Sequence, residues 1–110
     1  MREIRYRSLV MSTLFVGAAV LPALSSAHSL LFNCRAAADS MVHCMGEFSD
    51  GSDAIGMTVQ VMAYDERVLF KGALGGDSSL QFKRPEGEFF VRLEDGGEHS
   101  VEVDHTDVAP

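Results

Sequence analysis

The stretch LLFNCRAAADSMVHCMGEF, residues 30–48, decides the fold. Apolar and polar residues alternate on both sides of its centre, which is the period of a half-buried β-strand. Cys34 and Cys44 share the phase of the apolar residues, and they pair symmetrically around a turn at residues 36–40. The stretch therefore predicts a β-hairpin whose two cysteines meet on its buried face.

Two cysteines are too few to build a whole scaffold, but Cys34 and Cys44 can form one cross-strand disulfide. Closing so short a loop is expected to stabilise the fold by roughly 2–3 kcal/mol. The alternative is a redox-active or metal-binding pair. Redox-active pairs usually lie two residues apart, and neither cysteine lies in a helix-start setting with cationic neighbours. We favour the structural disulfide.

Five further runs with the same alternation follow, and Gly, Asp and Pro residues separate them: 57–64, 68–70, 80–82, 89–94 and 100–104. Val68 and Phe70 are expected to form the inner face of the fourth strand. No segment after residue 27 shows a convincing helical stripe of apolar residues. The pattern predicts an all-β fold, a seven-stranded antiparallel β-sandwich of immunoglobulin-like architecture.

Residues 1–27 have the three-part layout of a secretory signal peptide. Three arginines come first, an apolar stretch from Leu9 to Leu24 follows, and Ser25-Ser26-Ala27 ends in small residues that signal peptidase recognises. The alternative, an uncleaved anchor, needs about 20 continuous apolar residues. We expect a signal peptide at 1–27, a sandwich domain at 28–105 and a flexible tail at 106–110, in a periplasmic or secreted protein.

The charge is divided unevenly, because residues 1–27 carry +2 whereas residues 28–110 carry −9. A surface of that sign repels phosphate backbones and anionic lipids, so nucleic-acid binding and direct membrane insertion after cleavage are not expected. The sequence also has no phosphate-binding Gly loop before a helix and no nucleophile elbow. We expect no enzyme activity.

Strands that alternate in direction place two sets of loops at opposite ends of the sandwich. One end collects two histidines and six carboxylates but no Lys or Arg: His28, Asp50, Asp53, Asp77, Glu94, Asp95, Glu98 and His99. The opposite end collects basic residues among its acids: Arg35, Arg67, Lys83 and Arg84. The molecule is therefore expected to be strongly acidic at one end.

Cleavage after Ala27 would leave His28 with a free amine beside its imidazole, and His99 would add a second ring. Three nitrogens suit a Cu, Ni, Co or Zn ion, with Glu98 and Asp50 as outer ligands. The alternative is that His28 is a frayed terminus and His99 an ordinary turn residue. His105 is less favoured than either as a ligand.

The region after residue 28 resembles the small carboxypeptidase-regulatory-like, or transthyretin-like, β-sandwich modules. The resemblance rests on Phe48-Ser49-Asp50-Gly51, Val68-Leu69-Phe70-Lys71-Gly72, Lys83-Arg84-Pro85-Glu86-Gly87 and Gly97-Glu98-His99-Ser100. Similar modules occur beside bacterial nickel and cobalt uptake systems, so the resemblance implies periplasmic handling of a Ni, Co or Cu ion. It implies a membrane metal transporter or another periplasmic protein as partner. The competing hypothesis is an interaction or structural module without a metal.

Overall fold

The structure, a computed structural model, describes residues 29–98 and 100–110. The described residues form seven strands and two short 3-10 turns, and every strand falls on a run that the sequence pattern predicts. They are β1 (Leu30–Ala37), η2 (Ala38–Ser40), β2 (Met41–Phe48), β3 (Thr58–Met62), β4 (Val68–Ala73), β5 (Ser79–Lys83), β6 (Phe90–Glu94), β7 (Ser100–Asp104) and η3 (His105–Asp107).

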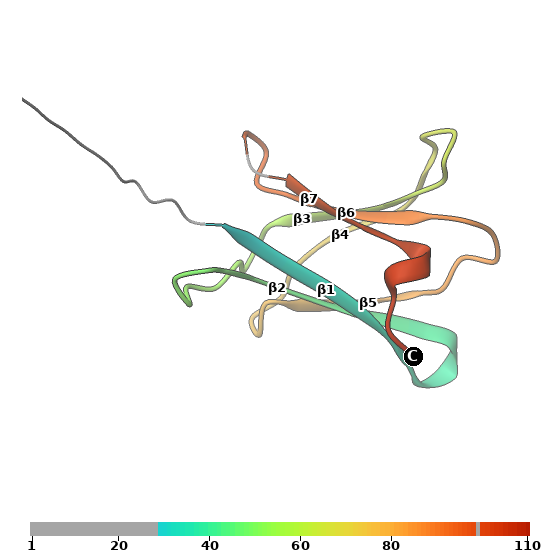
Figure 1. Cartoon of the computed structure of the whole chain (residues 1–110), viewed down its shortest axis with the longest axis horizontal. Coiled ribbons are helices and arrows are strands. Elements are labelled where there is room, and N and C mark those ends of the chain that lie inside the picture. Colours follow the sequence, from blue (N-terminus) through green and yellow to red (C-terminus); the bar gives the residue numbers. More distant parts are fainter. Residues whose placement is uncertain (1–28, 99) are drawn as a thin grey trace, which may run out of the picture.

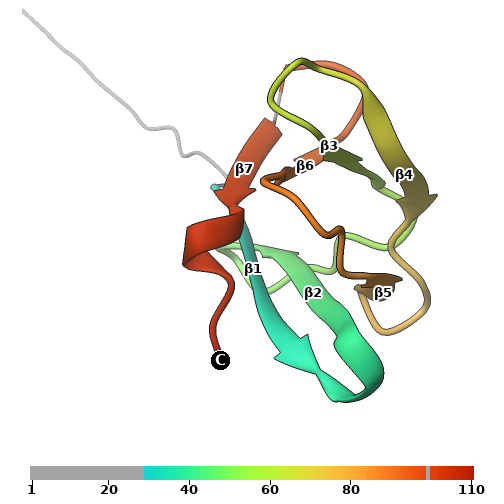
Figure 2. The same cartoon turned by 90° about the vertical axis from the view of Figure 1, so that its right-hand side faces the viewer.

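The strands make two packed sheets, one of three strands in the order β1-β2-β5 and one of four in the order β4-β3-β6-β7. Every pairing between neighbouring strands in these sheets is antiparallel. Figures 1 and 2 show the two layers from perpendicular directions. The predicted all-β sandwich is confirmed. In the described part of the chain, no helix is long and apolar enough to span a bilayer.

The core lies between the sheets and consists of the inward-facing residues of the alternating runs. The largest fully buried side chains come from both layers: Phe82, Phe89, Leu93, Val42, Val59, Val61, Val91 and Cys44. Packing is close enough that a Cβ on Gly46 would lie 2.9 Å from Leu93 Cδ2 and 3.1 Å from Leu74 Cδ1. At this point in β2 the space that a side chain would need is already filled by leucines.

The hairpin of β1 and β2 has the predicted register. Cys34 pairs directly with Cys44, their Cα atoms are 4.0 Å apart, and the two sulfurs form a disulfide. Both residues belong to the hydrophobic core, with 3% and 0% of their surface exposed. The structural disulfide is therefore confirmed, and the covalent link lies inside the core rather than on the surface.

The prediction for β4 is wrong in one respect, because Val68 and Phe70 do not form a buried inner face. They are 51% and 37% exposed, and Leu69 between them is 42% exposed. β4 lies at the edge of the larger sheet, and none of its residues is buried. Phe70 still stacks on Phe82 of β5, with ring centroids 5.8 Å apart, so the burial is partial.

Residues 106–110, expected to be a flexible tail, instead extend the fold. After η3, the chain returns to the free edge of β1 and forms a parallel bridge between Ala109 and Arg35. The Ala36 N–H donates to the Ala109 carbonyl at 2.7 Å, and the Ala109 N–H donates to the Cys34 carbonyl at 3.0 Å. The C-terminal segment therefore covers one edge of the three-stranded sheet.

Removing the disulfide by Cys34→Ala with Cys44→Ala is expected to lower the free energy of unfolding by about 2–3 kcal/mol, because the link closes a short loop of the unfolded chain. Urea unfolding of the variant and of oxidised and reduced wild-type protein measures this loss. Alkylation of native protein without reductant should add no label. Two labels per chain, or equal stability of the oxidised and reduced forms, would contradict the assignment.

Candidate functional site

Strand direction divides the loops between two ends of the sandwich. The start of β1 lies at the same end as the loops β2–β3, β4–β5 and β6–β7, while the turns β1–β2, β3–β4 and β5–β6 lie at the other (Figure 1). The first end contains the carboxylates that the sequence places there, and its loops, residues 49–57, 74–78 and 95–99, contain no Lys or Arg. This is the acidic end.

At the acidic end, the start of β1 is fixed to the β2–β3 loop. The Ser29 N–H donates to Ser49 Oγ at 3.0 Å, and the Ser49 N–H donates to the Ser29 carbonyl at 2.8 Å. Asp50, the next residue, accepts hydrogen bonds through Oδ1 from the Ser52 N–H and the Ser52 hydroxyl. The described chain therefore begins beside one of the carboxylates proposed as an outer ligand.

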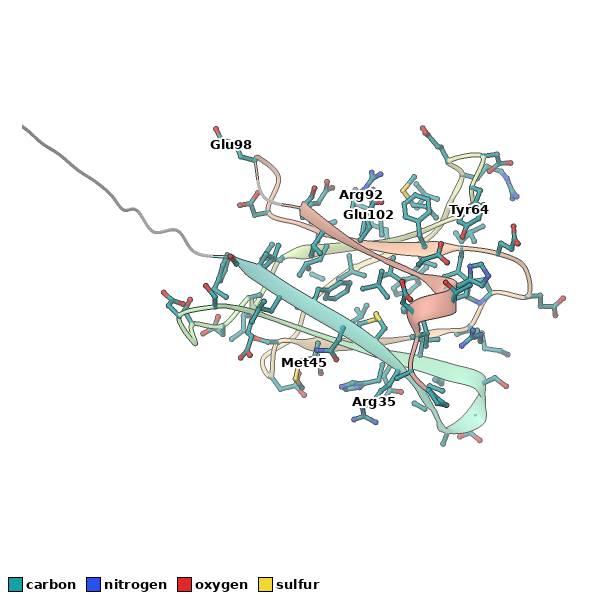
Figure 3. The ribbon with its side chains drawn as sticks, in the orientation of Figure 1. Arg35, Met45, Tyr64, Arg92, Glu98 and Glu102 are labelled. Atoms are coloured by element: carbon teal, nitrogen blue, oxygen red, sulfur yellow. A yellow bond between two sulfur atoms is a disulfide. The ribbon has the colours of Figure 1, made fainter. Side chains whose placement is uncertain are left out.

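The start of β7 lies at this same end. β1 and β7 contact each other although they belong to different sheets, and both run away from the acidic end (Figure 1). Glu98 lies on the β6–β7 loop that leads into β7, and its side chain projects outward (Figure 3). The two proposed histidine ligands, His28 and His99, lie outside the described residues. Within the described ranges, no group of three His, Cys, Asp or Glu side chains could hold a metal ion.

A second polar cluster lies at the opposite end, where Tyr64 of the β3–β4 loop meets the end of β7 (Figure 3). The Tyr64 hydroxyl donates to Asp104 Oδ1 and lies 3.2 Å from His105 Nδ1. His105 Nδ1 is also 3.2 Å from the Phe89 carbonyl oxygen. Asp104 Oδ2 accepts from the Thr106 N–H and hydroxyl, which caps η3. The cluster joins the β3–β4 loop to β7 and η3.

The same contacts shift two pKa values in opposite directions. The hydrogen bond to Asp104, with help from desolvation and the negative charge of that carboxylate, raises the pKa of Tyr64 to about 12. The hydrogen bonds from Tyr64 and Thr106 lower the pKa of Asp104 to about 2. The pair therefore holds a neutral phenol and an ionised carboxylate over a wide pH range. This suits a structural role, and we call the contact between Tyr64 and Asp104 the clasp.

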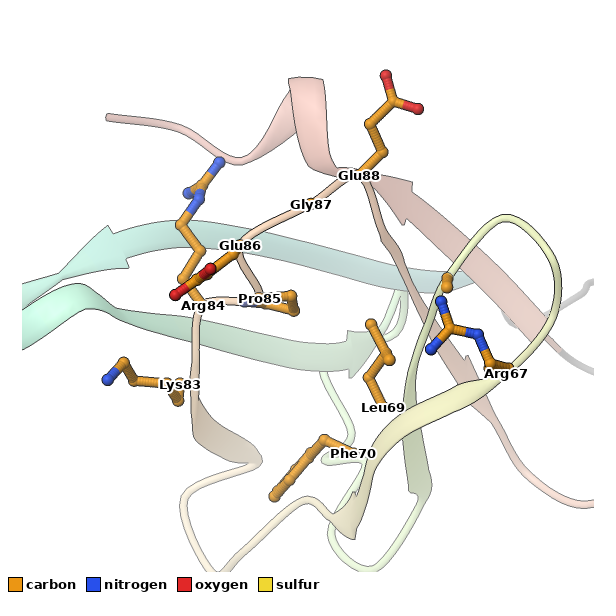
Figure 4. A pocket seen from close by; sticks show the side chains of 10 residues that line it. Arg67, Leu69, Phe70, Lys83, Arg84, Pro85, Glu86, Gly87 and Glu88 are labelled. Carbon is orange, nitrogen blue, oxygen red and sulfur yellow. The ribbon is translucent and has the colours of Figure 1, made fainter.

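Between β4 and the β5–β6 loop lies an open groove of about 540 Å³ (Figure 4). Its apolar lining includes Leu69, Phe70 and Pro85, and its cationic lining consists of Arg67, Lys83 and Arg84. The sequence pattern predicts no role for this groove. Its one visible signal is Val68-Leu69-Phe70, three consecutive apolar residues that break the alternation of a half-buried strand.

Comparisons with protein-family models, with curated proteins and with solved structures find no match for this chain. The structure itself establishes a small all-β protein of two antiparallel sheets with one disulfide.

We expect Tyr64→Phe to weaken the pH dependence of stability at both extremes. Because the pKa of Asp104 is lowered, its contribution is complete above its ordinary pKa of 3.8 and is lost as pH falls towards about 2. Because the pKa of Tyr64 is raised, its contribution is complete below 10.0 and is lost as pH rises towards about 12. Thermal unfolding across pH measures both losses.

Direct titration of the phenol by ultraviolet absorbance provides the second measurement. The sequence contains two tyrosines, Tyr6 and Tyr64, so the Tyr64→Phe variant identifies which transition belongs to the clasp. Asp104→Asn is expected to return the Tyr64 pKa towards its ordinary value, because the negative acceptor is gone. A wild-type Tyr64 that ionises near 10.0 would refute the clasp.

Proposed function

We propose that this chain is an exported, non-catalytic binding module that handles a divalent Ni, Co or Cu ion at its acidic end, as an accessory to metal uptake. The observation that carries the proposal is that β1 and β7 contact each other and start at the same end. Ser29 comes directly before β1 and follows His28 in the sequence. Glu98 lies two residues before β7 and directly precedes His99.

The donor chemistry supports a borderline metal ion rather than calcium or magnesium. A free amine at His28 with its imidazole and the imidazole of His99 would supply nitrogen ligands, which copper, nickel and cobalt prefer. Glu98 and Asp50 would supply carboxylates, either to the ion or to the rings as hydrogen-bond acceptors. The absence of Lys and Arg from the surrounding loops favours a cation, because no positive charge there opposes it.

The resemblance to carboxypeptidase-regulatory-like modules supports the same proposal. It suggests a periplasmic location after removal of residues 1–27 and a membrane metal transporter or another periplasmic protein as partner. The second candidate is an interaction or structural module whose acidic end contacts a partner without a metal. The two candidates differ in one measurable property, which is metal binding that depends on His28 and His99.

The test is calorimetric titration of the purified exported protein with Ni(II), Co(II) and Cu(II), after intact mass has established its N-terminus. We expect one ion per chain, with binding about tenfold weaker or more for His99→Ala. One extra residue before His28 should weaken binding similarly, because it removes the amine from the chelate. His43→Ala is the matched control, since His43 lies on β2 and contacts Gln81.

Binding should also fall as pH drops, first below about 8, where the chelating amine becomes protonated, and further below about 6.5, where imidazoles do. Equal affinity of the wild type, His99→Ala and the extended form would reject the proposed ligands. An N-terminus other than His28 would remove the chelating amine. If no form binds any of the three ions, the module without a metal is the remaining candidate.

A further inference from the structure

We infer that β4 is a docking edge for an extended, acidic segment of a partner protein, which adds to the four-stranded sheet as a further strand beside β4. This inference is independent of the proposed metal site, because β4 lies on the side of the sandwich away from β1 and β7 (Figure 2). It rests on the free backbone of β4, its exposed apolar side chains and the cations around it.

The backbone of β4 has an unused hydrogen-bonding side. In the described part of the chain, β4 pairs only with β3. Next to the strand end, the Leu74 N–H donates to the Met57 carbonyl and the Leu74 carbonyl accepts from the Gly56 N–H, so Leu74 faces the β3 side. Because orientation alternates along a strand, Ala73 and Lys71 direct their N–H and C=O groups away from β3. These groups are a template for another strand.

Of the four edge strands of the two sheets, β1 and β4 differ in whether another segment covers them. At β1, the C-terminal segment occupies the edge through the bonds of Ala109 to Ala36 and Cys34. At β4, no described segment does so, and Val68, Leu69 and Phe70 are all more than a third exposed. Exposed apolar residues on an uncovered edge strand are typical of a strand-addition site.

The groove beside β4 can accommodate side chains of the added segment. Leu69 and Phe70 form part of its apolar lining with Pro85 across from them, and the Arg67 side chain projects towards Leu69 (Figure 4). Alternate side chains of an added strand point to the same face. One set can therefore contact this apolar lining while the other remains in solvent.

The charge around the groove favours an acidic segment. Six Lys and Arg residues follow residue 28, and four of them lie on β4 or line the groove: Arg67, Lys71, Lys83 and Arg84. The groove is also lined by Glu86 and Glu88, of which Glu88 points away from Leu69 and Phe70 (Figure 4), and Arg67 is already ion-paired with Asp65 at 2.8 Å. Four cations against these three carboxylates leave a small local positive excess in a region that carries −9 overall.

The same charges disfavour a second copy of this chain as the occupant. An antiparallel pairing of two β4 edges would bring Lys71 and Arg67 of one copy close to the same residues of the other. An acidic partner segment meets the cations of β4 without adding cations of its own.

The test uses the purified protein and two short capped peptides, one in which valine alternates with glutamate and one with lysine in place of each glutamate. We expect the acidic peptide to bind and to shift the backbone amide resonances of residues 68–73. The basic peptide should bind at least about fivefold more weakly. Lys71→Glu should weaken the acidic peptide by about fivefold, whereas the matched reversal Arg35→Glu should not.

Lys71→Pro removes an outward N–H while leaving the ladder to β3 intact, so it should abolish peptide binding without loss of folding. Unchanged thermal unfolding of this variant shows that the fold persists. The inference is overturned if neither peptide binds, if both bind equally, or if the shifts lie outside residues 68–73. A dimer in sedimentation experiments that Lys71→Pro dissociates would also overturn it, by making a second copy the occupant.

Discussion

The disulfide between Cys34 and Cys44 is the interaction on which the smaller sheet depends. A chain of this size buries a modest share of its surface on folding, so a covalent link within the core has a large relative effect. The same two residues organise their neighbours, because Cys44 pairs with Leu80 of β5 and the Cys34 carbonyl accepts from Ala109. The link therefore fixes β1 against β2, and β5 and the C-terminal segment are built onto that hairpin.

The unequal width of the two sheets explains the remaining surface features. The larger sheet has one strand more than the smaller one, and β4 at its edge contributes no residue to the buried core. Phe70 reaches Phe82 of β5, but Val68 and Leu69 are 51% and 42% exposed. A register shift next to Val61 marks where β4 departs from regular pairing with β3. The exposed edge and the groove thus follow from strand count, which is a property of the whole fold.

Local patterns predicted what depends on neighbours in sequence. The alternation phase of Cys34 and Cys44 predicted the exact pairing of residues in the hairpin. The alternating direction of the strands predicted which loops lie together at the acidic end. The exposure of Val68 could not be predicted from the sequence. Val68, Leu69 and Phe70 are all apolar, so alternation does not show which of them face the core, and the place of a strand in its sheet depends on residues far away in the chain. The Tyr64 clasp was missed for the same reason, since the capping pair Asp104 and Thr106 is visible in sequence but its partner lies 40 residues away. The proposed ligands His28 and His99 lie outside the described residues.

The separation of charge lets one small sandwich present two different surfaces. We propose a cation for the loops of the acidic end and an anionic segment for the cations near β4. The overall charge of −9 after residue 27 opposes that segment at long range, but at physiological salt such repulsion is screened over about 8 Å. Contacts at Lys71 act within that distance, and they act together with the apolar lining and the free backbone. Short-range complementarity therefore governs docking at β4, and raising the salt concentration weakens both the opposing and the favourable electrostatic contribution.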